Sequence, residues 1–206
     1  MVDRPDSPDA LPFVRARTPE QRDDRLAQLV QVTRRLLADV RAGEVTLGAI
    51  AAAAGIAKSG VLRYAGSREA LLLLVMYQEH REWLDELRTA TGAVRGEPAQ
   101  QLAHTLACRP VLCDLISASP VLMSRLSPDE AATVRAQGRD ISERLRAVLE
   151  PQLSLDAKQL ELLTAALHAF AGTVWGWAVP ASDGASVAEL EGTLAALLHT
   201  FIAGLR

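Results

Sequence analysis

Apolar residues recur along the chain at spacings of three and four, a pattern that predicts helices. The first stripe runs from Leu26 to Val40 and follows Thr18 and Pro19, which suit an N-cap and a first helical turn; Gly43 is expected to end this helix. A piece after Pro110 is expected to end near Pro120. No segment alternates as a strand does, so we predict an all-α protein. The other helices are expected to begin near Ser67, Pro98, Ser127, Asp156 and Ser186.

Two short helical runs meet at Gly55 and predict a helix-turn-helix. Thr46 can cap the first run, and Ala51 to Ala54 carry so little bulk that another helix can approach closely. Gly55 suits the left-handed backbone that turns the chain. After it, Ile56 and Val61 are apolar anchors, while polar side chains lie on the other face.

The segment from Thr46 to Leu72, with its ending GxxKxxxxxYxxSREALL, resembles the DNA-binding region of the TetR family of bacterial repressors. The resemblance implies an N-terminal three-helix DNA-binding domain and a long fourth helix from Arg68. It also implies a helical C-terminal domain that dimerises and binds a small ligand. Two positions depart from the family pattern. Leu62 replaces a common phosphate-contacting tyrosine, and Ala65 replaces a common core phenylalanine.

Length and composition suit two units. Residues 1–17 are rich in Pro and Asp and suggest a disordered arm. We expect a helix-turn-helix domain at 18–66 and a regulatory and dimerisation domain at 67–206, which starts with a linking helix at 67–90. The net charge of -3 hides a basic N-terminal part. From Arg15 to Arg68 there are ten basic and five acidic residues, which favours contact with DNA.

In this scheme the second short helix enters the major groove, and its flanks face phosphates. For Lys58 and Arg63 the alternative is a solvated surface charge, and for Tyr64 it is core packing. Two such helices in a dimer would lie about 34 Å apart or a multiple of it, which requires a roughly palindromic double-stranded operator. The predicted DNA-binding residues are Thr46, Lys58, Ser59, Gly60, Arg63, Tyr64, Ser67 and Arg68.

The last two helical segments carry more apolar surface than one inward stripe requires. Gly172 and Gly176 leave a flat track on which another helix could lie, although packing within the chain is an equal alternative for any single residue. The family resemblance favours a homodimer built as a four-helix bundle. The predicted interface residues are Leu163, Leu167, Gly172, Gly176, Leu194, Leu198 and Phe201.

The resemblance also implies an effector pocket after Pro98. Candidates to line it are mainly apolar or aromatic and suit a hydrophobic or amphipathic molecule, although each is individually more typical of a plain core or surface residue. These candidates are His104, Cys108, Leu112, Leu115, His168 and Trp175.

Catalytic, metal and membrane signals are weak. The histidines are scattered without an HExxH pair, and no phosphate-binding Gly-rich loop or nucleophile elbow occurs, so we expect no enzyme, cofactor or metal. Cys108 and Cys113 match no metal spacing and are expected to be reduced core thiols. Without an apolar span or leader, and with the arginine bias of a GC-rich genome, a cytoplasmic bacterial protein is expected.

The expected function is therefore that of a ligand-released dimeric repressor. Two alternatives stay open: a helical ligand-binding or interaction protein with degenerate DNA binding, and an activator of the same fold.

Overall fold

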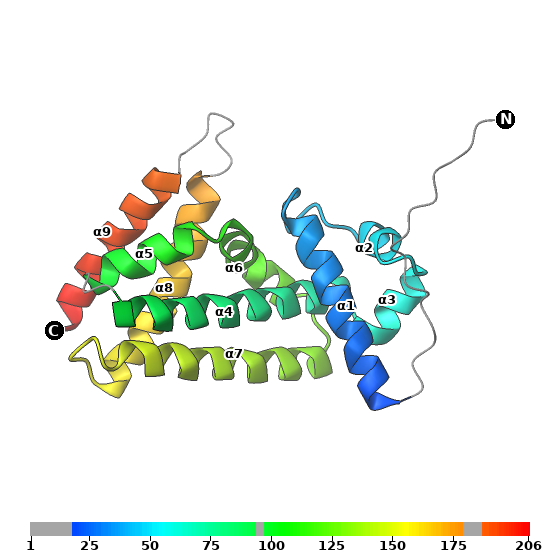
Figure 1. Cartoon of the computed structure of the whole chain (residues 1–206), viewed down its shortest axis with the longest axis horizontal. Coiled ribbons are helices and arrows are strands. Elements are labelled where there is room, and N and C mark those ends of the chain that lie inside the picture. The colour runs from blue at the N-terminus through cyan, green and yellow to red at the C-terminus, as the bar shows by residue number, and fades with distance from the viewer. Residues whose placement is uncertain (1–17, 94–96, 179–186) are drawn as a thin grey trace.

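The computed structural model describes residues 18–93, 97–178 and 187–206. Within these ranges the chain forms nine α-helices and no strand, which confirms the all-α prediction (Figure 1). The predicted arm at 1–17, with Arg15 and Arg17, lies outside the described residues, as does the predicted cap Ser186.

Helices α1 (Pro19–Leu37), α2 (Leu47–Ala53) and α3 (Lys58–Ala65) form a three-helix unit at one end of the molecule (Figure 1). Thr18 caps α1 by accepting a hydrogen bond from the backbone N–H of Gln21. The prediction that α1 reaches Gly43 is wrong, because α1 ends at Leu37. The carbonyl groups of Ala42 and Val45 instead accept hydrogen bonds from the guanidinium of Arg68, which holds the turn after α1.

The connection between α2 and α3 follows the predicted turn. Gly55 has a φ of 66°, in the left-handed region, and the N–H of Ile56 donates to the carbonyl of Ala51 at 3.0 Å. This bond closes the end of α2 so that α3 can cross it. Of the small residues before Gly55, Ala51 is buried, whereas Ala52 and Ala53 are exposed.

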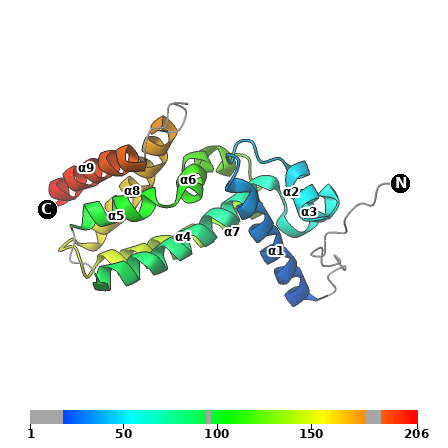
Figure 2. The same ribbon diagram turned by 45° about the horizontal axis from the view of Figure 1, so that its top comes forward.

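Helix α4 (Arg68–Ala93) starts at the three-helix unit and runs through the rest of the molecule, as Figure 2 shows from a second angle. It packs against α1 at one end and against α6 (Pro110–Met123) and α7 (Pro128–Leu149) further along. Leu71, Leu72, Trp83 and Leu87 are almost completely buried. Helix α4 therefore contacts both the three-helix unit and the helices beyond it.

Helices α5 (Pro98–Ala107) and α6 meet at a bend of 93°. The prediction that the second piece ends near Pro120 is wrong, because α6 continues through Pro120 to Met123. Proline removes the N–H that would bond to the carbonyl of Ile116, but the hydroxyl of Ser119 donates to that carbonyl at 2.8 Å. In the described part of the chain no single helix is long and apolar enough to cross a membrane; only the bent pair α5 and α6 meets both criteria together.

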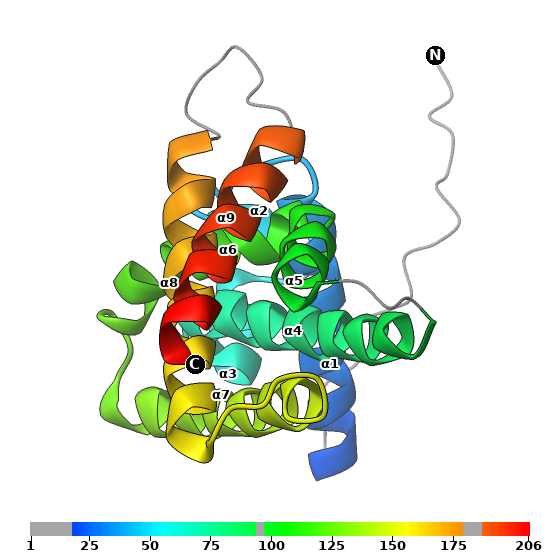
Figure 3. The same ribbon diagram turned by 90° about the vertical axis from the view of Figure 1, so that its left-hand side faces the viewer.

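Helix α7 begins with the predicted capping box of Ser127 and Glu130. Helices α8 (Ala157–Ala178) and α9 (Val187–Leu205) lie side by side at the end of the molecule away from α1–α3 (Figure 3). Phe170 of α8 and Phe201 of α9 meet edge to face, with ring centroids 5.8 Å apart. Cys113 is buried as predicted, but Cys108 is exposed, because it lies at the bend just after α5.

Candidate nucleic-acid interface and ligand cavity

Helix α3 has one buried face and one exposed face. Val61, Tyr64 and Ala65 point into the core, with 0%, 7% and 8% of their surface exposed. The opposite face presents four exposed side chains in succession around the helix, an arrangement that follows from its period of 3.6 residues. These side chains are Lys58, Ser59, Leu62 and Arg63, and Gly60 is half-buried beside them.

Lys58 lies against the start of α2. A Cβ placed on Gly48 would come within 3.2 Å of the Lys58 Cε and 3.5 Å of its Nζ, so the lysine stem crosses the α2 backbone there. Thr46 caps α2 by accepting from the N–H of Ala49 at 3.1 Å. The ammonium therefore sits beside a helix N-terminus, which also carries positive potential. Among the described residues no carboxylate pairs with Lys58, and an anion would fit this surface.

Arg63 lies over the ring of Tyr64, with its guanidinium carbon 4.6 Å from the ring centroid, and it donates a hydrogen bond of 2.7 Å to the tyrosine hydroxyl. The aromatic ring itself is buried in the core. Of the two interpretations of Tyr64, core packing is the one that the geometry supports. Tyr64 positions Arg63 and does not itself project from the surface.

Arg68 does not point outward as predicted. Its guanidinium donates to the carbonyl groups of Ala42, at 2.5 Å, and Val45, and it pairs with Glu69. Its side chain is only 16% exposed. Because the guanidinium of Arg68 bonds to the carbonyl groups of the turn after α1, it is not available for the predicted phosphate contact.

Ser67 is also engaged within the protein. Its hydroxyl oxygen accepts from the N–H of Ala70 at 3.0 Å and caps α4. Ser67 also hydrogen-bonds to the carboxylate of Glu130. Burial raises the pKa of Glu130, but the hydrogen bonds from Ser67 and Ser127 outweigh it, and the net pKa is lowered. The carboxylate thus joins the α3–α4 turn to the start of α7. Because the Ser67 hydroxyl is bonded within the protein, Ser67 does not serve as the predicted DNA contact.

Two further groups of charges join the three-helix unit to the other helices. Glu79 of α4, almost completely buried, pairs with Arg34 of α1 and with Arg109, whose Nη1 lies 3.2 Å from a Glu79 oxygen. Asp114 of α6 pairs with Arg41 at 3.2 Å. Part of the positive charge counted between Arg15 and Arg68 therefore serves internal ion pairs and not DNA.

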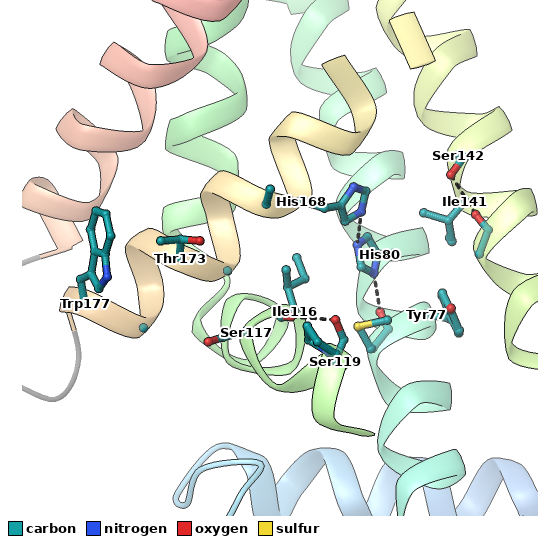
Figure 4. A pocket seen from close by; sticks show the side chains of 16 residues that line it. Tyr77, His80, Ile116, Ser117, Ser119, Ile141, Ser142, His168, Thr173 and Trp177 are labelled. Atoms are coloured by element: carbon teal, nitrogen blue, oxygen red, sulfur yellow. Dashed lines mark hydrogen bonds between the residues drawn. The ribbon is translucent and has the colours of Figure 1, made fainter. Parts of the chain in front are cut away.

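A cavity of about 680 Å³ lies among α4, α6, α7 and α8 (Figure 4). Its lining is mainly apolar, with hydroxyl groups and two histidines. The side chains come from Met76, Tyr77, His80, Ile116, Ser117, Ser119, Pro120, Ile141, Ser142, His168, Ala169, Thr173 and Trp177, and Gly138, Gly172 and Gly176 complete the wall.

The two imidazoles of this cavity point toward one another (Figure 4). The Nε2 atoms of His80 and His168 are 3.0 Å apart, and His80 is 1% exposed. Burial, followed by the charge of His168, lowers the pKa of His80 to about 3, and burial also lowers the pKa of His168. Burial therefore favours the neutral form of both imidazoles.

Only one of the six predicted pocket residues, His168, lines this cavity. His104 is exposed and pairs with Glu191 at 3.1 Å, and Cys108 lies at a different surface hollow. Leu112 and Leu115 are core residues with no exposed surface. Trp175 donates its indole N–H to Asp114 at 3.1 Å and faces α6. His80 was missed because the 88 residues that separate it from His168 hide their proximity in the sequence.

The predicted dimer residues mostly face the protein's own core. Leu163, Leu167, Leu194 and Leu198 are 0–1% exposed. The flat track of Gly172 and Gly176 accommodates α6. A Cβ on Gly172 would lie 3.4 Å from the Ser117 backbone, and one on Gly176 would lie 3.4 Å from the Ser117 Oγ. For these residues packing within the chain is the correct interpretation; of the seven, Phe201 has a partly exposed side chain at the outer surface.

Two protein families match the chain. The family described as "Bacterial regulatory proteins, tetR family" matches residues 29–75, and the family described as "Tetracyclin repressor-like, C-terminal domain" matches residues 77–206. No curated protein matches the chain.

Several solved structures share the fold. A TetR transcriptional regulator from Rhodococcus sp. RHA1 is 18% identical, over 89% of this chain and 97% of that one, with a TM-score of 0.55. A TetR-family regulator from Pectobacterium atrosepticum is 14% identical over 92% and 97%, with a TM-score of 0.61. The fatty acid degradation regulator FadR from Bacillus halodurans is 15% identical over 89% and 99%, with a TM-score of 0.57.

Proposed function

Because the chain belongs to the TetR family of bacterial regulatory proteins, we propose that this transcriptional regulator is a dimeric repressor. It binds a palindromic operator through α3, and a small, mainly apolar ligand in the 680 Å³ cavity releases it. Residues 18–66 are the DNA-binding domain and residues 67–206 the regulatory domain in this proposal. The observation that carries it is the exposed polar face of α3 opposite a fully buried one.

Lys58, Ser59 and Arg63 supply the polar contacts to the operator. Lys58 and the capped start of α2 at Thr46 suit a phosphate, because their positive potentials add. Arg63 has further guanidinium N–H groups beyond the one bonded to Tyr64, and these can reach base edges or phosphates. Leu62, 43% exposed on the same face, can contact a thymine methyl group. The half-buried Gly60 adds no side chain that would hold the helix away.

The dimer uses the outer face of α8 and α9. This face contains the partly exposed Phe170–Phe201 pair, and among its described residues no charged side chain lies along the central part. A second copy related by a two-fold axis can therefore bury it. The exposed fractions of 44% for Leu162 and 36% for Leu197 support this choice. The proposed interface residues are Leu162, Ala166 and Phe170 of α8 and Thr193, Ala196, Leu197, Thr200 and Phe201 of α9.

Release by a ligand requires that the ligand bind one arrangement of the dimer better than the other. Met76, Tyr77 and His80 of α4 line the cavity, and the start of α4 holds the turn before α2 through Arg68. Glu130 joins α7, which also lines the cavity, to the α3–α4 turn. A ligand that shifts α4 relative to α7 would therefore change the spacing of the two α3 helices.

Fluorescence anisotropy with DNA from upstream of the protein's own gene tests the DNA-binding surface. Changing both Lys58 and Arg63 to alanine should weaken binding by about 1–3 kcal/mol per base contact and make it less sensitive to salt. The matched control changes Lys158 and Arg88, which lie on α8 and α4 and are 70% and 75% exposed. Equal losses in the two double variants, or none in the first, would refute the assignment.

A reporter gene behind the same DNA separates repression from activation, because deletion of the regulator should raise its expression. Lower expression after deletion would identify an activator. Absence of salt-sensitive, competition-resistant DNA binding would leave only a ligand-binding protein of this fold.

A further inference from the structure

The hydrogen bonds of the two cavity histidines fix where their protons lie. The Nδ1 of His80 is 2.9 Å from the carbonyl oxygen of Met76, and the Nδ1 of His168 is 2.7 Å from that of Thr164. A carbonyl oxygen can only accept, so both Nδ1 atoms must carry a proton and donate it. In the neutral pair each Nε2 therefore bears a lone pair and no proton.

These two Nε2 atoms nevertheless lie 3.0 Å apart, which is a hydrogen-bond distance. Two lone pairs at this distance repel. A hydrogen bond forms only if one additional proton lies between them, and the pair then carries one positive charge. The geometry of the pair thus fits a singly protonated state.

The surroundings do not stabilise that charge. Within the described part of the chain, no carboxylate and no other charged side chain lines the cavity, to which α6 contributes only Ile116, Ser117, Ser119 and Pro120. Beside the pair on α4 lie Tyr77 and Arg81, and the arginine charge opposes protonation. A second hollow that His168 also borders is balanced, with two acidic and two basic side chains: Glu143 and Arg146 of α7, and Lys158 and Glu161 of α8.

We infer that the ligand of this cavity is an amphipathic carboxylic acid, whose carboxylate binds beside His80 and His168 while the pair takes up one proton. The inference rests on the proposed function, since it assigns the chemistry of the effector. The protons and charges balance in either case. A carboxylate that enters as the anion recruits one proton from solvent to an Nε2, and an acid that enters protonated transfers its own proton there.

Other groups in the cavity match such a ligand. Among the described residues, the hydroxyl groups of Tyr77 and Ser117 have no hydrogen-bond partner and can donate to a carboxylate. The tyrosine ring centroid is 6.3 Å from that of His80. Met76, Ile116, Ile141 and the glycines of α8 leave space for an apolar body, and 680 Å³ is a typical volume for a small-molecule site.

A metal ion is the other group that would relieve the facing lone pairs. Structural and catalytic metal sites require three or four protein ligands, and the described residues contain no group of three or more histidine, cysteine or acidic side chains. A carboxylic acid needs no additional protein side chain to hold it, and its carboxylate supplies the negative charge that the protonated histidine pair lacks.

Isothermal titration calorimetry tests the inference with straight-chain acids from hexanoate to tetradecanoate, each beside the alcohol of equal length. Titrations at pH 7 in phosphate and in Tris give the protons taken up, because the two buffers differ in ionisation enthalpy. We expect an acid that binds roughly tenfold or more tightly than its alcohol, with an uptake approaching one proton. Equal binding of acid and alcohol without proton uptake would overturn the inference and leave the cavity as an effector site. Failure of every probe to bind would overturn the inference and the proposed release by an apolar ligand together.

The variant His168→Gln provides a sharper test. The glutamine amide can donate to the lone pair of His80 without an added proton, so proton uptake should disappear and the preference for acids should fall. His104→Gln is the matched control, since His104 is 63% exposed and outside the cavity. Circular dichroism checks that both variants fold. Unchanged proton uptake in folded His168→Gln would contradict the assignment.

Discussion

Removal of the Asp114 carboxylate should destabilise the junction between the three-helix unit and the regulatory helices. This carboxylate, 13% exposed, accepts from three donors: the backbone N–H of Ala42 at 2.7 Å, the indole N–H of Trp175 at 3.1 Å and the guanidinium of Arg41 at 3.2 Å. It thus links the turn after α1 to α6 and α8. Two of the donors, Arg41 and Ala42, belong to the turn after α1, and the third, Trp175, belongs to α8.

The size of the effect follows from what each donor loses in Asp114→Ala. The N–H of Ala42 and the indole of Trp175 lose their acceptor, at a cost of about 1–3 kcal/mol each. Arg41 is 39% exposed, so water takes over much of its contact and it adds little. We expect a loss of about 2–6 kcal/mol, and a fall in melting temperature of roughly 4–24 °C for a protein of this length.

Thermal and urea unfolding followed by circular dichroism measure this loss. Asp114→Asn keeps the shape and one carbonyl oxygen, so it should lose roughly half as much. Asp85→Ala is the control, because Asp85 is 72% exposed and, among the residues that the structure describes, forms an ion pair with Arg88 of its own helix alone. It should change stability by less than about 0.5 kcal/mol. A loss in Asp114→Ala as small as in this control would refute the reasoning.

Three other predictions concern the operator, the pH response and the dimer. Leu62→Tyr restores the family's tyrosine on the exposed face of α3 and should tighten operator binding by about 0.5–1.5 kcal/mol, measured by anisotropy; weaker binding would mean that this face does not meet phosphates. The pKa of His80 is lowered to about 3 in the folded state, so protonation of this histidine favours the unfolded state. The free energy of unfolding should therefore fall as the pH drops from about 6.5 toward 3, by up to about 1.4 kcal/mol per pH unit for each such histidine. His168→Gln should reduce this acid sensitivity in urea titrations at pH 7 and pH 5, and an identical pH response would show that the pair is not its source. Ala196→Arg places a charge in the proposed interface and should give monomers in sedimentation velocity, whereas Ala132→Arg on the exposed side of α7 should remain dimeric. A dimeric Ala196→Arg protein would place the interface elsewhere.

The helix-turn-helix could be predicted from the sequence because its determinants are local. Thr46, Gly55 and the apolar spacing around Val61 act over a few residues, and the structure has a cap, a left-handed turn and a buried face at these positions. The capping box of Ser127 is local in the same sense. The direction of each helix face after Ser67 depends instead on which other helix it meets.

This dependence on the neighbouring helix explains why the sequence predicts the wrong contacts for several residues between α4 and α9. The sequence predicts a flat track at Gly172 and Gly176, and α6 lies against these two glycines. The buried leucines of α8 and α9 fill the core. The surface that remains for a partner is the outer face of these two helices, which has alanines and threonines and is less hydrophobic than the buried face. Arg68 looked like a phosphate contact because the sequence does not reveal that the carbonyl groups of Ala42 and Val45 need a donor.

Dimethyl sulfate footprinting of the operator tests the central claim most directly, since this reagent methylates guanine N7 in the major groove and adenine N3 in the minor groove. We predict two protected major-groove patches, about 34 Å apart or a multiple of it, that disappear when Lys58 and Arg63 are both changed to alanine. Protection confined to minor-groove adenines, or a single patch that survives in this double variant, would contradict operator recognition by α3 of a symmetric dimer.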